Sequence, residues 1–213
     1  MDDFNVIQEA TSWVREIFEA DATGHDFSHI ERVVKMSRYL AMREEADIFV
    51  CEMAALLHDV ADEKLTEDVM RANEDIDSLL QTLGVSQERR NQIKVAMKDV
   101  SFKGNHQVPK TLEGQIVQDA DRLDAIGALG IARTFAYGGS KGHKMHDPDW
   151  MESYKQTDYR DENKTTVYHF YEKLLKLKDL MNTQSAKSIA EKRHQFMESF
   201  LDQFYREWEG TDF

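Results

Sequence analysis

The sequence predicts an all-α protein, and three observations support this fold class. Only two prolines, Pro109 and Pro148, and ten glycines occur among its 213 residues, so long stretches contain no helix breaker. Good helix formers such as Leu, Ala, Met, Glu, Lys and Gln are abundant. Apolar residues also recur at helical spacing along most of the chain. We therefore expect one compact helical body over residues 1–213, without repeats or an interdomain linker.

Eight helices are expected from the apolar pattern and from residues that typically begin or end helices. Asp47 and Ser86 are typical N-caps, and Gly84 is a typical C-terminal stop. Thr111 and Glu113 resemble a capping box with the acidic residue displaced by one position. The expected ranges, approximate at both ends, are 4–18, 29–40, 47–58, 66–83, 86–102, 111–126, 167–181 and 185–208.

The C-terminal part of the chain is predicted to contain a loop and a helical hairpin. Residues 137–148 are the most loop-like segment, because they contain a Gly-Gly pair, a third glycine and a proline. The two long helices after it are expected to pack against each other. In the last one, aromatic residues recur every four positions and form either a packing face or a homodimer interface: Phe196, Phe200, Phe204 and Trp208.

Composition excludes several classes of partner. The net charge of −13 argues against binding a nucleic acid polymer, although a metal and a few cations can still hold a small phosphorylated ligand. The single cysteine, Cys51, lies in an apolar segment and is expected to be a core thiol in a reducing compartment. No signal peptide or bilayer-spanning apolar run is recognisable, so we expect a cytoplasmic protein without a membrane partner.

Histidine and aspartate residues indicate a metal site. His58 and Asp59 directly follow an apolar helical stretch, where an ionisable pair needs a partner to offset the cost of burial. Imidazole and carboxylate together suit Mn, Fe, Co, Ni or Zn. His29 lies upstream, and an acidic cluster lies downstream at residues 119–124. Three predicted helices could therefore supply ligands to one bundle-core site.

Three segments resemble the defining motifs of the HD superfamily of metal-dependent phosphohydrolases. They are residues 24–33 (GHDFSHIERV), 56–62 (LLHDVAD) and 120–128 (ADRLDAIGA). The segment 168–183 is similar to the tail of small stand-alone bacterial HD proteins, some of which are nucleoside triphosphate pyrophosphohydrolases. The resemblance implies a single HD-domain helical bundle, with a metal-binding core over about 20–130 and a C-terminal helical hairpin extension over about 131–213.

The resemblance also implies a ligand set and a metal. Asp121 occupies the Ala-Asp-basic-Leu position of the third motif, which favours it over Asp119 and Asp124. One ion is expected rather than two, because the region where some HD enzymes carry further histidines contains only His106. Mn is the expected ion, with Mg, Fe, Co, Ni or Zn as alternatives. The expected ligands are His29, His58, Asp59 and Asp121.

Two residues are assigned to catalysis by the same resemblance. Asp62 matches the acidic position that positions or activates water, and a solvated carboxylate at a helix end is the alternative interpretation. Arg122 follows the last ligand and could bind a phosphate oxygen, whereas a salt bridge to Asp119 or Glu113 is its structural alternative.

A further group of residues is expected to contact the substrate. The alternative for Asp124 is a local ion pair with a base, and for Lys141 a flexible connection. For Tyr154 it is packing in the core or an interface, for His25 a role at the helix start, and for Lys64 a solvated side chain. The substrate group consists of His25, Glu63, Lys64, Asp124, Lys141, Tyr154, His169 and Lys173.

The leading functional hypothesis is a pyrophosphohydrolase that converts (deoxy)nucleoside triphosphates to a monophosphate and pyrophosphate. The same scaffold also supports 5′-nucleotidase or alarmone hydrolase activity. A non-catalytic protein that binds metal and nucleotide to regulate a partner is a hypothesis of a different class.

Overall fold

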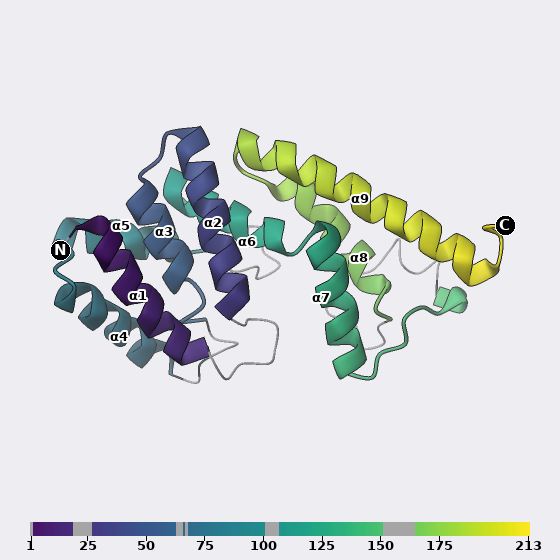
Figure 1. The fold of residues 1–213 in the computed structure, drawn as a ribbon, viewed down its shortest axis with the longest axis horizontal. Coiled ribbons are helices and arrows are strands. Elements are labelled where there is room, and N and C mark those ends of the chain that lie inside the picture. Colours follow the sequence, from purple (N-terminus) through teal and green to yellow (C-terminus); the bar gives the residue numbers. More distant parts are fainter. Residues whose placement is uncertain (1, 19–26, 63–65, 67, 101–106, 151–164) are drawn as a thin grey trace. The chain divides into compact units, whose positions relative to one another are not determined.

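The computed structural model describes residues 2–18, 27–62, 66, 68–100, 107–150 and 165–213, without the side chain of Trp150 (Figure 1). The expected contacts of His25, Glu63, Lys64 and Tyr154, and the position of His106, therefore lie outside the described residues. The described part is helical and contains no strand, which confirms the predicted all-α fold. Within it, no helix is long and apolar enough to cross a membrane.

Two compact units divide the chain, Met1–Asp121 and Arg122–Phe213. Helix α6 (Leu112–Asp124) spans the division. The other helices of the first unit are α1 (Asp3–Phe18), α2 (Phe27–Glu44), α3 (Ile48–Leu57), α4 (Val69–Thr82) and α5 (Gln87–Met97). Those of the second are α7 (Gly127–Ser140), η1 (Pro148–Trp150), α8 (Tyr168–Glu172), η3 (Leu174–Leu180) and α9 (Gln184–Glu209).

Helix α3 is the central helix of the first unit. It contacts α1, α2 and α5, and every residue from Phe49 to Leu57 is buried (Figure 1). Asp47 caps it as predicted, because Oδ1 of Asp47 accepts a hydrogen bond of 3.1 Å from the backbone N–H of Val50. Burial raises the pKa of the Cys51 thiol, which agrees with a core thiol rather than a nucleophile.

Helix α1 buries a different stripe from the one that its largest apolar residues suggest. The buried residues recur every four positions: Val6, Ala10, Val14 and Phe18. Phe4 and Ile17, which are larger, are 69% and 46% exposed. Small Ala10 lets a neighbouring element approach, and this makes it a better core residue than its size indicates.

Two helix ends also differ from the prediction. Helix α5 ends at Met97 rather than near residue 102, and Asp99 then adopts φ of 65°. Helix α6 ends at Asp124, so the expected helix over 111–126 is two residues too long. Gly127, with φ of 80°, begins α7 in a conformation that suits glycine.

The second unit corrects two predictions. Helix α7 continues to Ser140, so the predicted loop begins only at Lys141. Gly138 faces Thr166, whose Cγ2 would lie 3.1 Å from an added Cβ, and close packing therefore explains this glycine better than loop formation does.

The expected long helix over 167–181 is instead the short helix α8 followed by the 3₁₀ helix η3. Leu174 and Leu177 are buried three residues apart, and Leu180 continues this spacing. A three-residue interval matches the period of a 3₁₀ helix and explains the change. Helix α9 forms as predicted and packs against η3, so a helical hairpin is present with a shorter first arm.

The aromatic stripe of α9 is partly a packing face. Phe200 stacks on Phe170 with ring centroids 6.1 Å apart, and Phe204 contacts Phe135. Phe196 and Trp208 remain 53% and 44% exposed. The homodimer interface stays a prediction.

Candidate metal centre

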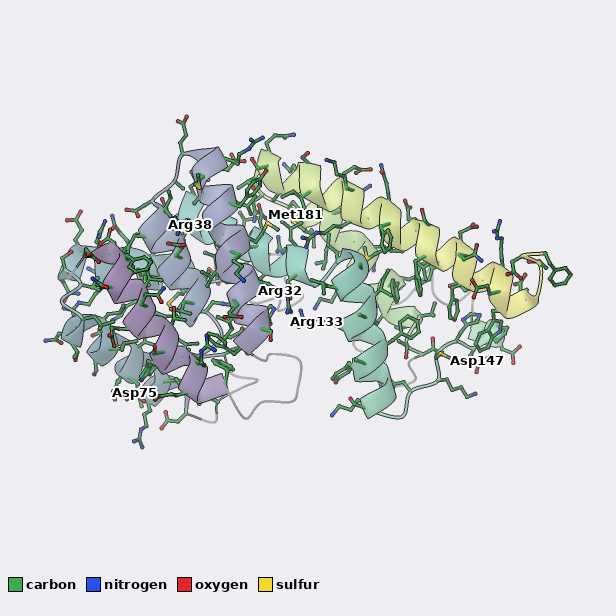
Figure 2. All side chains as sticks on the ribbon, viewed as in Figure 1. Arg32, Arg38, Asp75, Arg133, Asp147 and Met181 are labelled. Atoms are coloured by element: carbon green, nitrogen blue, oxygen red, sulfur yellow. The ribbon has the colours of Figure 1, made fainter. Side chains whose placement is uncertain are left out.

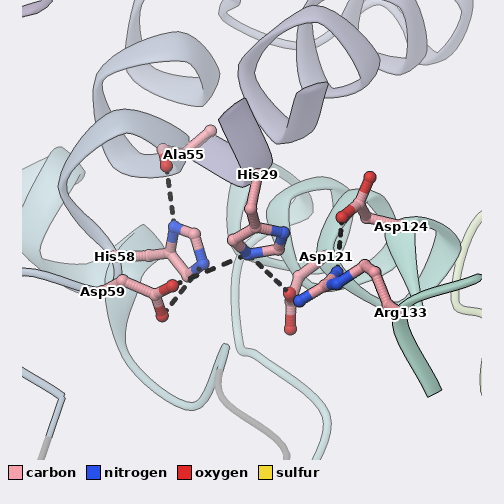
Figure 3. A network of polar contacts seen from close by, with 7 residues as sticks. All are labelled: His29, Ala55, His58, Asp59, Asp121, Asp124 and Arg133. Atoms are coloured by element: carbon pink, nitrogen blue, oxygen red, sulfur yellow. Dashed lines mark hydrogen bonds and ion pairs between the residues drawn. The ribbon is translucent and has the colours of Figure 1, made fainter. Parts of the chain in front are cut away.

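Four side chains from three segments of the first unit meet in one cluster (Figure 3). His29 comes from α2, His58 and Asp59 directly follow α3, and Asp121 lies in the last turn of α6. Ligand atoms of His29, His58 and Asp121 lie within 4.8 Å of one another. The cluster contains the same four residues to which the resemblance assigns the metal.

The end of α3 explains how two adjacent residues enter one site. The helix stops at Leu57, and the N–H of Val60 donates to the Leu57 carbonyl over 3.1 Å. The N–H of Asp62 then donates to the Asp59 carbonyl over 3.2 Å. Neighbours in a continuous helix do not share a face, so this turn is what allows His58 and Asp59 to approach the same point.

The hydrogen bond of His58 determines which of its nitrogens faces the site. Nδ1 lies 2.7 Å from the carbonyl oxygen of Ala55, and because that oxygen can only accept, Nδ1 must donate. In the neutral imidazole, Nε2 then carries a lone pair, and it lies 3.2 Å from Oδ1 of Asp59. Two acceptors at this distance repel each other unless a proton or a cation lies between them.

His29 has the same kind of surroundings. Its Nε2 lies 3.6 Å from Oδ2 of Asp59 and 3.5 Å from Oδ1 of Asp121. Both imidazoles are 1% exposed, and Asp59 is 5% exposed. Burial by itself lowers the pKa of His58, but the charges of Asp59 and Asp121, the hydrogen bond to Ala55 and the charge of Asp62 together raise it by more, so its pKa lies above the ordinary value. The site is buried and electronegative, and it selects for positive charge.

A divalent cation fits these donors. Two imidazole nitrogens and two carboxylates form a mixed nitrogen and oxygen set that first-row metals accept. The second nitrogen of His58 donates to a backbone carbonyl, which is the usual way in which a metal-binding histidine is oriented. The first unit therefore contains a candidate His/Asp metal site, while the ligand role of each residue stays a prediction.

The two predicted catalytic residues have different surroundings. Asp62 is half-buried, and its charge contributes to the raised pKa of His58, so its carboxylate lies near the metal cluster. Arg122 is 4% exposed, and its guanidinium donates to the carbonyl of Leu180 within the second unit. This contact is structural, and the expected salt bridge of Arg122 to Asp119 or Glu113 stays a prediction.

Of the predicted substrate residues, Asp124, Lys141, His169 and Lys173 are described, and all four belong to the second unit. Asp124 forms an ion pair of 2.6 Å with Arg133, which corresponds to the ion-pair alternative for this residue. Lys141 is exposed beside the ring of Tyr137.

His169 pairs with the buried Glu172 at 2.8 Å, and Lys173 is half-buried. Substrate binding by these residues stays a prediction.

Sequence reasoning missed three contributors to this region. The carbonyl of Ala55 orients His58, Arg133 neutralises Asp124, and Arg193 donates to the carbonyl of Leu123. The Ala55 contact follows from its position three residues before a predicted ligand at a helix end. No local spacing indicates Arg193, because it lies 70 residues from its acceptor.

Known proteins match this chain over its whole length. The HD domain family matches residues 26–126. The protein YpgQ of Bacillus subtilis is 37% identical over 215 aligned residues, which cover 100% of this chain and 98% of YpgQ. The crystal structure of YpgQ in complex with ADP matches with a TM-score of 0.81 at 35% identity, and all of both chains is covered.

An HD-superfamily hydrolase from Bacillus thuringiensis matches with a TM-score of 0.80 at 43% identity. That match covers 98% of this chain and 99% of the Bacillus thuringiensis chain. Relatives of this similarity and coverage share the fold. The chain therefore belongs to the HD superfamily and is a metal-dependent phosphohydrolase of that type.

Proposed function

We propose that the protein hydrolyses (deoxy)nucleoside triphosphates to a nucleoside monophosphate and pyrophosphate, with one Mn ion held by His29, His58, Asp59 and Asp121. The proposal rests mainly on the distance of 3.2 Å between Nε2 of His58 and Oδ1 of Asp59. The other His58 nitrogen, Nδ1, donates to the Ala55 carbonyl, so two acceptor atoms face each other. This arrangement calls for a cation, and phosphate ligands bring the complementary negative charge.

The nucleotide part of the proposal has separate support. The relative YpgQ, which is 35% identical in the structural match, was crystallised in complex with ADP. A diphosphate of adenosine shares its base, sugar and two phosphates with a nucleoside triphosphate. The acidic surface of this chain, with a net charge of −13, favours a small ligand bound through a metal over a nucleic acid polymer.

A divalent ion in this site would withdraw charge from a phosphate oxygen and lower the pKa of a water molecule. Asp62 follows Asp59 by three residues, and its backbone hydrogen bond to Asp59 holds it in the same turn. We assign Asp62 as the base that receives a proton from the attacking water. The water oxygen bonds to the α-phosphorus while the bond to the bridging oxygen breaks, and pyrophosphate leaves with the electron pair.

Phosphate binding is assigned to Arg122 and a lysine, of which Lys64 and Lys141 are the candidates. Arg122 is the less direct candidate, because its buried guanidinium already donates to Leu180. A lysine acts as a mobile point charge and needs no fixed geometry to neutralise a phosphate oxygen.

Turnover of a nucleotide panel with Mn tests the proposal, with products separated by ion-exchange chromatography. The panel contains all dNTPs, NTPs and NMPs together with guanosine tetraphosphate. The variants are Asp59→Ala, Asp62→Asn and the control Asp75→Asn, which changes an exposed carboxylate on α4 (Figure 2).

Monophosphate and pyrophosphate should appear with the wild type and the control, and not with Asp59→Ala. Asp62→Asn should lower kcat by about 10²- to 10⁴-fold, the usual contribution of a general base, while the protein still binds Mn. Phosphate released from monophosphates would indicate a 5′-nucleotidase, and pyrophosphate released from guanosine tetraphosphate alone an alarmone hydrolase. Nucleotide binding without turnover would favour a regulatory protein.

A further inference from the structure

The C-terminal end of α6 needs outside support, and Asp121 lies in its last turn. The final four carbonyls of a helix have no partner within the helix. Here the turn tightens, because the N–H of Ala125 donates to Arg122 and the N–H of Ile126 donates to Leu123, each over 3.2 Å. A helix end of this kind frays readily unless other groups satisfy it.

Arg193 of α9 supplies one support. Its guanidinium donates to the carbonyl of Leu123, two residues after Asp121. Its stem crosses Gly127, where an added Cβ would lie 3.0 Å from the Arg193 Cγ. Gly127 also has φ of 80°, so its lack of a side chain serves both the turn and the passage of the arginine.

Arg133 of α7 supplies a second support. It pairs with Asp124 at 2.6 Å, and Asp124 is 5% exposed (Figure 3). The Asp124 carboxylate also acts on Arg193, since burial lowers the pKa of Arg193 and the charge of Asp124 counteracts that effect. The buried carboxylate of Asp124 thus forms an ion pair with Arg133 of α7, and its charge also acts on Arg193 of α9.

We propose that Arg193 and Arg133 are positioning residues for Asp121, which they hold at metal-binding geometry by fixing the last turn of α6. The inference rests on the proposed metal centre. Asp121 shares a single helical turn with Leu123 and Asp124, so a turn that unwinds also displaces its carboxylate. Metal sites tolerate deviations of only about 0.2 Å in ligand distance, so a small displacement costs affinity.

The test measures Mn affinity by titration calorimetry and amide exchange of the peptide over residues 119–127 by mass spectrometry. Arg193→Met retains the stem over Gly127 and removes the guanidinium, and Arg193→Lys restores a donor. Arg133→Met removes the partner of Asp124. Arg206→Met is the matched control, because Arg206 is an exposed residue of α9 whose guanidinium contacts Asp202 and Gln203 of the same helix.

Arg193→Met and Arg133→Met should weaken Mn binding by about 10- to 100-fold, the usual effect of losing an outer partner of a ligand, and accelerate exchange over 119–127. Arg193→Lys should recover part of both losses, and Arg206→Met should match the wild type. Unchanged Mn affinity in both methionine variants, or an equal loss in Arg206→Met, would overturn the proposal.

This result is separable from the proposed function. A wild type that binds Mn with the expected variant pattern but hydrolyses no triphosphate would contradict the pyrophosphohydrolase and leave the positioning role standing. A wild type that hydrolyses triphosphates while the methionine variants bind Mn normally would contradict the positioning role and leave the pyrophosphohydrolase standing. A wild type that binds no Mn would overturn the metal centre and the positioning role together.

Discussion

At the end of α3, the imidazole of His58 donates to the Ala55 carbonyl and turns its other nitrogen toward Asp59. Deleting the Ala55 side chain would leave this contact intact, because the acceptor is a backbone atom. The orientation of His58 therefore depends on the helix ending at Leu57 and not on a second side chain. The same helix end thus places both the proposed ligand and the backbone carbonyl that orients it, so this orientation requires no second side chain.

His146 in the second unit predicts how stability responds to acid. It is 5% exposed and contacts the rings of Phe204, Tyr205 and Trp208. Burial lowers its pKa, and Asp147 and Glu209 offset only part of that effect. Since the unfolded chain has an ordinary histidine pKa of about 6.5, the unfolded state binds more protons below that pH. The His146 contribution is thus fully present above about pH 6.5 and is lost as the pH falls toward the folded pKa.

Chemical denaturation between about pH 7.5 and pH 5.5 measures this contribution. The His146→Phe variant should show a smaller loss of unfolding free energy over this interval than the wild type. The exposed His143 provides the control, and His143→Gln should keep the wild-type dependence. Equal slopes in wild type and His146→Phe would contradict the assignment.

Individual site residues were predictable where their role depends on motif position, and were missed where it depends on tertiary packing. His29, His58, Asp59 and Asp121 stand at recognisable positions of three motifs, and the structure brings these side chains together. Arg133 and Arg193 meet the end of α6 only after the chain has folded. The sequence offered Asp124 a local ion pair with a base, and the structure shows that Arg133 forms such a pair.

At the scale of the helices, residues at the ends gave the most accurate predictions. Asp47 and Ser86 cap their helix N-termini as predicted, because their side chains satisfy amides that the helix itself leaves unpaired. The 3₁₀ helix η3 was missed, since lysine and leucine favour an α-helix locally. The interval between its buried leucines was the signal that could have revealed it.

Gly138 and Gly139 in α7 make a matched pair for testing close packing. An added Cβ at Gly138 would collide with Thr166, whereas one at Gly139 would meet nothing within 4 Å. Gly138→Ala should lower the unfolding free energy by about 1–3 kcal/mol, the usual cost of overpacking. Gly139→Ala should raise it by up to about 1 kcal/mol, because alanine favours the helix. Denaturant titration measures the unfolding free energy of both variants, and equal changes in the two would contradict close packing at Gly138.

At the scale of the whole molecule, composition and periodicity predicted the fold class, whereas the division after Asp121 had no signal in them. The boundary lies inside α6, where neither proline nor glycine interrupts the sequence from Gln115 to Ala125. A linker would have been visible as a change in composition. A continuous helix shared by two units is not visible in this way, because the same helical pattern continues across the boundary.

Metal binding should change the stability of the protein as a whole. A cation that binds the folded state at 100 times its Kd adds about 2.7 kcal/mol to the free energy of unfolding. We expect Mn to raise the Tm of the wild type and of Asp75→Asn, and EDTA to reverse the increase. Asp59→Asn should show little increase, since it removes one of the carboxylates that face His29 and His58. An equal increase in Asp59→Asn would place the ion elsewhere.

The unequal exposure of the four proposed ligands has a kinetic consequence. His29, His58 and Asp59 are at most 5% exposed, whereas Asp121 is 23% exposed. A chelator, like a triphosphate, should therefore meet a bound ion on the side of Asp121, because the other three ligands are shielded by protein. The rate at which EDTA strips the protein should then rise with the EDTA concentration, and a bound triphosphate should slow the loss of metal.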